Sequence, residues 1–175
     1  AAAEEAAFTS GDGVNKAKGF LAYTATTEAD SARAFGSLQK KATGGSGVIS
    51  ADDIKKFPFL LKAGYRNGAV FIGDLMLLKD GQGNYIWRPG LTEGTPSMLN
   101  GYSYMENESM PDVAAGAKSL AFGNFKRGYY IVDRMGTRVL RDPYTNKPFI
   151  GFYTTKRVGG MVVDSNAIKL LEVAA

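Results

Sequence analysis

The side chains available for chemistry are mainly carboxylates, lysines, arginines and hydroxyls, because the 175-residue sequence contains neither histidine nor cysteine. This excludes catalysis by a Ser-His-Asp triad or a Cys-His pair, and metal sites built from histidine or cysteine. Paired carboxylates, which glycoside hydrolysis needs, occur at Asp52 and Asp53 and at Glu106 and Glu108. Helix capping and exposure in a loop explain both pairs. We therefore predict no catalytic residues, no cofactor, no metal site and no enzymatic activity.

A basic stretch over residues 121–163 is the other chemically distinctive feature. The basic residues are Lys126, Arg127, Arg134, Arg138, Arg141, Lys147, Lys156 and Arg157, and the acidic ones are Asp133 and Asp142. They alternate with aromatic and β-branched residues, which is typical of strands. The whole chain has a net charge of +4. Such a surface could contact nucleic acid, an acidic protein surface or only solvent.

An acidic segment, residues 106–112 (ENESMPD), lies apart from the basic stretch in the sequence. A subunit with opposite charges on separate patches can place one patch on the other patch of a neighbouring copy, and such contacts close into rings. Strands with charged edges also discourage uncontrolled strand pairing. The charge pattern therefore favours a self-assembling structural protein.

The elements that must position these patches include both helices and strands. Helices are predicted at residues 1–8, 28–40 and 50–62, the second with Ala32, Phe35 and Leu38 on one face, and the third with Ser50 as N-cap and Pro58 as an interior kink. Turns are predicted at 42–47, 64–67 and 142–146, and strands at 18–23, 69–72, 85–87, 98–105, 117–123, 129–134, 137–141, 149–163 and 168–173. Met135-Gly136 is predicted to be a hairpin turn.

The ends of the chain and its hydropathy bear on localisation. No apolar run reaches 18 residues, so no membrane span is predicted. The first residues, AAAEEAAF, lack the basic start of a signal peptide and read like the end of a helix whose beginning is missing. We therefore expect a processed or truncated product.

Several motifs occur in a characteristic order. They are KDGQGNYIW at 79–87, AFGNF and GYYIVDR within 121–134, and KRVGG, VVD and AIKLL within 156–171. In order and spacing they resemble the major capsid proteins of tailed double-stranded DNA bacteriophages. EEAAFTSGDGVNKAKGFL at 4–21 is similar to the junction between that family's spine helix and its axial domain. The resemblance covers nearly the whole chain.

The resemblance implies an α+β fold, the Hong Kong 97-type capsid fold, with axial and peripheral domains. Residues 14–120 and 160–175 would form the axial domain, and residues 1–13 and 121–159 part of the peripheral domain. The family's N-terminal arm, extended loop and most of its spine helix are expected to be missing. A gap is also expected near Gly73-Asp74, because the segment that follows is too short for the family's helix.

A covalent crosslink is a further property of some family members, which join neighbouring subunits by a Lys–Asn isopeptide bond that a buried glutamate promotes. The resemblance places Thr155 at the position of the glutamate and Pro148 at that of the asparagine, with Asn146 displaced from it. We therefore predict no autocatalytic crosslink.

The function that the resemblance implies is that of a structural subunit of a phage or prophage capsid, which self-assembles into pentamers and hexamers around double-stranded DNA. Contacts between subunits are expected at charged residues of the two patches, namely Arg134, Arg138, Arg141, Asp142, Glu106, Glu108 and Asp112. The expected partners are other copies of the chain, a portal protein, a scaffold or maturation protease, and packaged DNA through weak non-specific contact, but no membrane. The protein would reside in the virion, and in the host cytoplasm before assembly.

Two alternatives stay open. An encapsulin-like compartment shell would carry protein cargo in place of DNA, and a neighbouring cargo gene or portal gene would separate these two readings. A free nucleic-acid-binding module would bind DNA as a soluble monomer with a strong dependence on salt.

Overall fold

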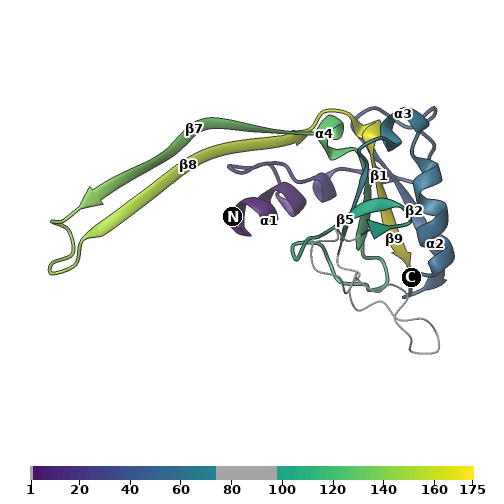
Figure 1. The fold of residues 1–175 in the computed structure, drawn as a ribbon, viewed down its shortest axis with the longest axis horizontal. Helices are drawn as coiled ribbons and strands as arrows, with labels where there is room; N and C mark the ends of the chain where they lie inside the picture. The colour runs from purple at the N-terminus through teal and green to yellow at the C-terminus, as the bar shows by residue number, and fades with distance from the viewer. Residues whose placement is uncertain (1, 74–97) are drawn as a thin grey trace.

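The computed structural model describes residues 2–73 and 98–175, which form a seven-stranded mixed sheet and a separate two-stranded ribbon (Figure 1). The strand order of the large sheet is β1-β2-β9-β6-β3-β5-β4. Its strands are β1 (Ala25–Thr26), β2 (Leu38–Ser46), β3 (Val70–Gly73), β4 (Met98–Leu99), β5 (Tyr102–Glu106), β6 (Leu120–Gly123) and β9 (Ile168–Ala174). The ribbon consists of β7 (Tyr129–Asp142) and β8 (Gly151–Val162).

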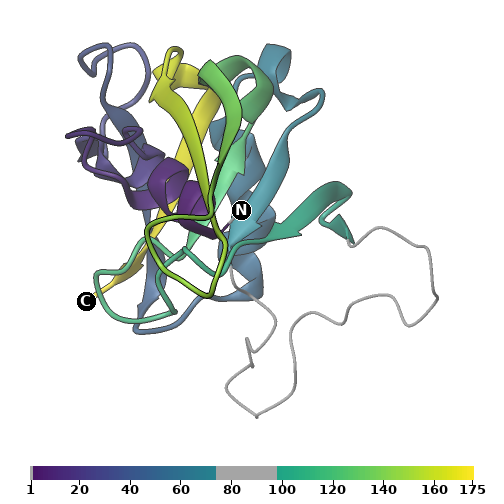
Figure 2. The same ribbon diagram turned by 90° about the vertical axis from the view of Figure 1, so that its left-hand side faces the viewer.

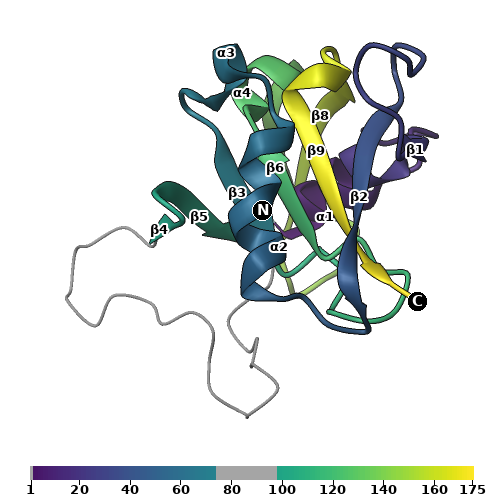
Figure 3. The same ribbon diagram turned by 90° about the vertical axis from the view of Figure 1, so that its right-hand side faces the viewer.

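Short helices cover both faces of the large sheet (Figure 3). On one face lie α2 (Ala51–Lys56) and η2 (Phe57–Leu60), and on the other lie α1 (Ala2–Ser10) and η1 (Phe20–Ala22). The other helical turns are α3 (Ala63–Arg66), α4 (Phe125–Gly128) and η3 (Ser165–Ala167). The sheet is therefore the middle layer of three.

The core lies on both sides of the sheet, because successive residues of a strand point to opposite faces. Phe122 of β6 and Leu171 of β9 pack with Phe57 beneath α2 and η2. Leu170 packs on the opposite face with Phe20 of η1. β9 is thus buried on both faces, as expected for a central strand of a covered sheet.

Ser50 is the N-cap of α2, as the sequence predicts, and the structure shows that it forms a capping box with Asp53. The Ser50 hydroxyl accepts a hydrogen bond from the Asp53 amide at 3.2 Å, and the Asp53 carboxylate accepts one from the Ser50 amide at 3.2 Å. Pro58 lies in η2, so the predicted helix over 50–62 changes after Lys56 from α-helical to 3₁₀ geometry.

Replacing Ser50 with alanine is expected to lower the free energy of unfolding by about 1 kcal/mol, because the first turn of α2 loses a hydrogen-bond acceptor. Urea denaturation measures the change. Ser50→Thr keeps the hydroxyl and is the control. An alanine variant as stable as the parent chain would show that this cap contributes nothing.

Several local predictions are confirmed and others are wrong. The helix at 1–8 and the strands at 69–72, 117–123 and 168–173 are confirmed as α1, β3, β6 and β9, with bounds shifted by a few residues. Residues 64–67, predicted as a turn, fall mostly in the single helical turn α3, and residues 18–23 contain η1 instead of a strand. Burial of Phe20 beneath the sheet explains the second difference, because a helical turn directs this ring into the core.

The predicted helix over 28–40 is also wrong. Phe35 is 78% exposed whereas Leu38 is fully buried at the start of β2, so these residues do not share a helical face. The glycine-rich residues 42–47, predicted as a loop, belong mostly to β2, which pairs in parallel with β9. Pairing of β2 with β9, which is distant in sequence, has overridden the helical pattern at Leu38 and the glycine signal at 42–47.

Two hairpins differ from the prediction. Residues 98–105 form two strands, joined where Asn100 and Gly101 both have positive φ angles of 51° and 81°, as a tight hairpin turn requires. Residues 129–141 form one continuous strand, because Met135 and Gly136 lack such angles and β7 pairs with β8. The extended segment predicted at 149–163 is confirmed as β8, which continues through its two central glycines.

The predictions for residues 74–97, which include the strand at 85–87, lie outside the described residues, as does the Asp74 side of the expected gap. The assignment to axial and peripheral domains stays a prediction. Its boundary at residue 121 falls inside β6 of the large sheet, whereas the ribbon begins at Tyr129.

Candidate subunit-interface ribbon

The β7–β8 ribbon projects from the rest of the molecule, with solvent on both faces for most of its length (Figures 1 and 2). Isolated two-stranded ribbons are marginally stable in water, because they cannot bury a hydrophobic face. The ribbon nevertheless carries many large apolar side chains that are about half exposed or more, namely Tyr130, Ile131, Val132, Val139, Leu140, Phe152, Tyr153 and Met161. A surface of this kind marks a site of protein–protein contact.

Tyr129 anchors the base of the ribbon. Its ring meets Phe8 of α1 edge-on at a centroid distance of 6.0 Å, and its hydroxyl donates a hydrogen bond to the Lys18 carbonyl at 2.9 Å. Burial raises the pKa of Tyr129 to about 12, so the phenol stays protonated and donates throughout the neutral range. The backbone adds a bond from the Lys18 amide to the Gly160 carbonyl at 2.9 Å. These contacts fix the direction in which the ribbon leaves the sheet.

Lys156 of β8 forms the second link between the ribbon and α1. Its ammonium lies 3.0 Å from a carboxylate oxygen of Glu4 and 3.5 Å from one of Asp133. The hydrogen bond with Glu4 raises the pKa of Lys156. All three groups are substantially exposed, so the pairs orient side chains more than they stabilise the fold.

Two register shifts in β7, between Asp133 and Arg138, divide the ribbon into a base and an outer half. Such bulges place an extra residue in one strand and change which side chains share a face. In the outer half, directly paired residues share a face. Leu140 pairs with Tyr153 on one face, and Arg141 pairs with Phe152 on the other. Each face therefore presents apolar groups, with arginines beside them.

The structure places the four predicted ribbon residues on β7. Arg134, Arg138 and Arg141 are exposed and have no hydrogen-bond or ion-pair partner among the described residues. Asp142 has a local role instead: its carboxylate accepts hydrogen bonds from the Tyr144 amide at 2.9 Å and from the Thr145 hydroxyl and amide. The Thr145 hydroxyl is the main cause that lowers the pKa of Asp142. Asp142 therefore shapes the turn at the tip.

The three predicted acidic partners lie elsewhere in the fold. Glu106 ends β5, and Glu108 and Asp112 follow in the connection to β6, all with exposed side chains. Within the described part of the chain, no ion pair joins these carboxylates to the ribbon arginines. The expected contact between the two patches would have to form between copies, and it stays a prediction.

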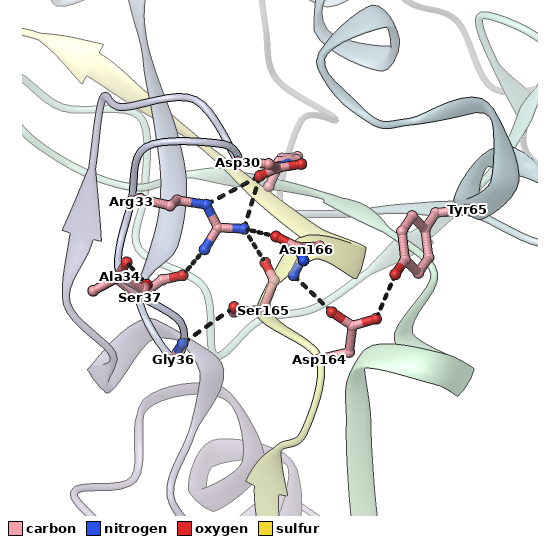
Figure 4. A network of polar contacts seen from close by, with 10 residues as sticks. Asp30, Arg33, Ala34, Gly36, Ser37, Tyr65, Asp164, Ser165 and Asn166 are labelled. Carbon is pink, nitrogen blue, oxygen red and sulfur yellow. Dashed lines mark hydrogen bonds and ion pairs between the residues drawn. The ribbon is translucent and has the colours of Figure 1, made fainter.

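The sequence reasoning missed a buried ionic cluster, which we call the Asp30 cluster: Asp30, Arg33 and Lys169. Figure 4 shows Asp30 beside the Arg33 guanidinium. One carboxylate oxygen of Asp30 accepts hydrogen bonds from the Lys169 ammonium and from Arg33, whose Nη2 lies 2.8 Å away. All three side chains are almost fully buried. A lysine inside the apolar strand IKLLEV was the one signal in the sequence, because a buried cation needs a buried partner.

Arg33 extends this cluster into a network that fastens residues 30–37 to the start of β9 (Figure 4). Its guanidinium donates to the carbonyls of Ser37 and Ser165 and to the side chain of Asn166. Nearby, the Tyr65 hydroxyl donates to Asp164 at 2.7 Å. The bonds from Arg33 to Ser165 and Asn166 join segments more than 130 residues apart, and the Tyr65–Asp164 bond spans 99 residues, so they form only when the sheet is assembled.

Metal sites and membrane-spanning helices are two remaining features, and neither is present among the described residues. Over residues 2–73 and 98–175 no group of three or more acidic residues is placed to hold a metal ion. In the same ranges, no helix has the length and apolar character needed to cross a bilayer.

Known proteins provide an independent comparison. The model of the Phage capsid family matches residues 1–173. Among solved structures, the capsid of an empty GTA particle computed with C5 symmetry is 45% identical with a TM-score of 0.83, over 99% of this chain and 62% of that one. The capsid of a native GTA particle, also computed with C5 symmetry, is 44% identical with a TM-score of 0.83, over 99% and 61%. The comparison with curated proteins gave no match.

The chain thus spans a little over three fifths of the length of these capsid chains. The α+β capsid fold implied by the sequence motifs is confirmed, since the observed sheet, helices and ribbon superpose on capsid structures over nearly all of this chain. On the family match over residues 1–173 and the similarity to two solved capsids, the chain belongs to the phage capsid family.

Proposed function

We propose that this chain is a subunit of an icosahedral capsid that assembles into pentamers and hexamers and encloses double-stranded DNA. The observation that carries the proposal is the β7–β8 ribbon, which exposes apolar side chains on both faces and lacks a covering layer among the described residues. Burial of such surface between copies is the main favourable term in association. Membership of the capsid family and the similarity to capsids of GTA particles support this assembly.

The contacts between subunits would use both charge and apolar surface. Arg134, Arg138 and Arg141 have no partner among the described residues of their own chain, so carboxylates of a neighbouring copy can reach them. Asp142 holds the turn at the ribbon tip. The acidic partners would be Glu106, Glu108 and Asp112 of a neighbour. Each exposed pair is weak, but many simultaneous contacts in a closed shell make the assembly stable.

Further partners belong to the same proposal. The ribbon and α1 would form the peripheral domain, and the large sheet the axial domain. A portal protein, a scaffold or maturation protease and packaged DNA would meet the shell, which would reside in the virion after assembly in the host cytoplasm. The role is structural, without catalysis and without a crosslink between subunits.

Electron microscopy of the protein expressed from its complete reading frame tests this function. We expect closed shells with pentameric and hexameric capsomers, and nuclease-protected DNA inside particles purified from the producing cells. Protein that remains monomeric at concentrations where capsid proteins assemble would contradict the proposal. Closed shells filled with a protein cargo and free of DNA would favour a compartment shell instead.

A further inference from the structure

A basic trough lies at the base of the ribbon, between the turn over residues 12–18 and strands β7 and β8. It consists of two hollows of about 710 and 600 Å³. Both are lined by Asn15, Val158 and Gly159, so they adjoin at these residues. Gly159 contributes no side chain, and a Cβ built there would meet no atom within 4 Å. The floor of the trough is therefore open to close approach by an extended ligand.

The lining of the trough is strongly cationic. Arg134, Lys156 and Arg157 line the first hollow, and Lys16 and Lys18 line the second. Asp12 is the one acidic residue among the described lining residues. Cations thus stand on both walls, one wall from the turn and the other from the ribbon. Such a row of positive charge attracts a linear polyanion.

Two of these cations form no hydrogen bond or ion pair within the described chain. Lys156 pairs with Glu4 and Asp133, and Lys16 lies 3.7 Å from Asp12. Arg134 and Arg157, in contrast, have no hydrogen-bond or ion-pair partner among the described residues.

The bulge explains why Arg134 and Arg157 line the same hollow. Arg157 is paired with Met135, and Arg134 precedes Met135 at the register shift. Neighbouring residues of a regular strand point to opposite faces, but a bulge redirects one of them. The guanidinium groups of both residues are thereby available to oxyanions, to which they can donate two parallel hydrogen bonds.

We propose that this trough binds the phosphodiester backbone of double-stranded DNA, without regard to base sequence. The inference rests on the proposed function, because it names the part of the capsid subunit that meets the enclosed DNA. It assigns Arg134 at the base of the ribbon to DNA and leaves Arg138 and Arg141 for contacts between subunits. Arginines and lysines on two walls match a continuous row of phosphates. No helix is among the described residues that line the trough, so none can enter a groove of the DNA from it. We therefore expect contacts to the DNA backbone alone, with an affinity that depends on salt.

The acidic segment of a second copy is a less suitable occupant. Residues 106–112 are held as a turn on their own sheet: Met110 is buried, and the Asn107 side chain donates to Thr9 at 3.1 Å and accepts from the Ser109 amide at 2.8 Å. A segment fixed in this way cannot lie extended along the trough. DNA presents its charges along the whole length of the trough without rearrangement.

Fluorescence anisotropy with a labelled 30-base-pair duplex tests the proposal, using unassembled protein from the complete reading frame at 50–200 mM salt. The variant Arg157→Ser/Lys16→Ser removes one cation from each wall. We expect its affinity at 50 mM salt to fall about tenfold. The slope of log affinity against log salt should become shallower by about 1.8, at roughly 0.9 for each lost phosphate contact. Thermal unfolding must show that the variant is folded.

The matched control is Lys55→Ser/Lys126→Ser, which removes the same charge from exposed positions outside both the trough and the proposed subunit contacts. Its DNA affinity should stay within twofold of the parent protein. If both variants lose DNA affinity equally, DNA is attracted by the net charge of the protein and not by the trough, and the proposal is overturned. A trough variant that keeps DNA binding but loses self-association would also overturn it, and would assign the trough to a neighbouring subunit.

Shell assembly is measured by electron microscopy, separately from DNA binding. Shells that form from a protein without measurable affinity for the duplex would refute the trough and leave the proposed capsid function intact. DNA binding through the trough by a protein that never forms shells would contradict the capsid function and leave the trough as a binding site.

Discussion

Replacing Asp30 with alanine is expected to lower the free energy of unfolding by about 3–5 kcal/mol, the cost of removing one partner from a buried ion pair. Among the residues that the structure describes, Asp30 is the one carboxylate bonded to Arg33 and Lys169, and the Lys169 side chain is fully buried. Without Asp30, two cations remain in the interior with no counter-charge. The free energy of unfolding of a whole domain is about 5–15 kcal/mol, so a loss of this size leaves the folded state only marginally stable. Urea or thermal denaturation measures it.

The pH dependence of the same cluster has a defined sign. Burial opposes the ionisation of Asp30, but hydrogen bonds from Lys169 and Arg33 outweigh it and hold the pKa of Asp30 below its usual value of 3.8. A carboxyl with a lowered pKa in the folded state stabilises the fold fully above its pKa in the unfolded chain. We therefore expect this stabilisation at pH 5 and above. It should be lost as the pH falls below about 4 and through the pKa of the folded state.

Asp52→Ala is the control for Asp30→Ala. Asp52 is an exposed carboxylate paired with Lys56 at 3.0 Å on the surface of α2, and we expect its removal to have no measurable effect on stability. Replacing Asp30, Arg33 and Lys169 together with apolar residues should recover part of the loss, because no charge is then left buried without a partner. An Asp30→Ala variant as stable as the Asp52→Ala variant would show that the cluster does not stabilise the fold.

Replacing Leu140 and Tyr153 together with serine is expected to abolish shell assembly while the subunit itself stays folded. These residues pair across the ribbon on one face and are 66% and 54% exposed in the single chain. Burial of each in a contact between copies would contribute about 1.5–3 kcal/mol. Loss of both weakens every such contact by at least a hundredfold, since 1.4 kcal/mol is a factor of ten. The closed shell multiplies this loss over all its contacts.

Size-exclusion chromatography and electron microscopy measure the assembly, and thermal unfolding of the unassembled subunit checks the fold. The control is Leu140→Met/Tyr153→Phe, which keeps the apolar area and should assemble at close to the parent yield. If the serine variant forms shells with the same yield, the outer half of the ribbon lies outside the interface. If its subunit melts well below the parent, the side chains act within the chain instead.

The fold was predictable from the sequence where local chemistry decides it. Ser50, followed by two acidic residues, gave the start of α2 correctly, because a cap depends on neighbours three residues away. The apolar run at 69–72 and the mainly apolar run at 168–173 gave β3 and β9, because strands buried on both faces are rich in apolar residues. The order of motifs gave the capsid family, which the comparison with family models confirms.

The candidate site was predictable only in part. Its location in the basic stretch follows from composition, and the structure places Arg134, Arg138 and Arg141 on one exposed strand. The prediction divided that strand at Gly136, because glycine often marks a turn. In the structure, pairing with β8 keeps the strand continuous there. Asp142 looked like a contact residue, whereas its carboxylate is occupied by the turn that follows. Contact between copies at these residues stays a prediction.

The sequence by itself excluded histidine and cysteine chemistry and determined the capsid family, the two mainly apolar strands β3 and β9 and the N-cap of α2. The family depends on the order of motifs along the chain, and the others depend on residue type or on spacing along a few residues. The tertiary structure alone decided that β7 runs unbroken beside β8 and that Lys169 meets Asp30 from 139 positions away. It also brought the two walls of the basic trough together. The physical reason is that strand pairing and the satisfaction of buried charge depend on groups distant in sequence, whose meeting no local pattern encodes.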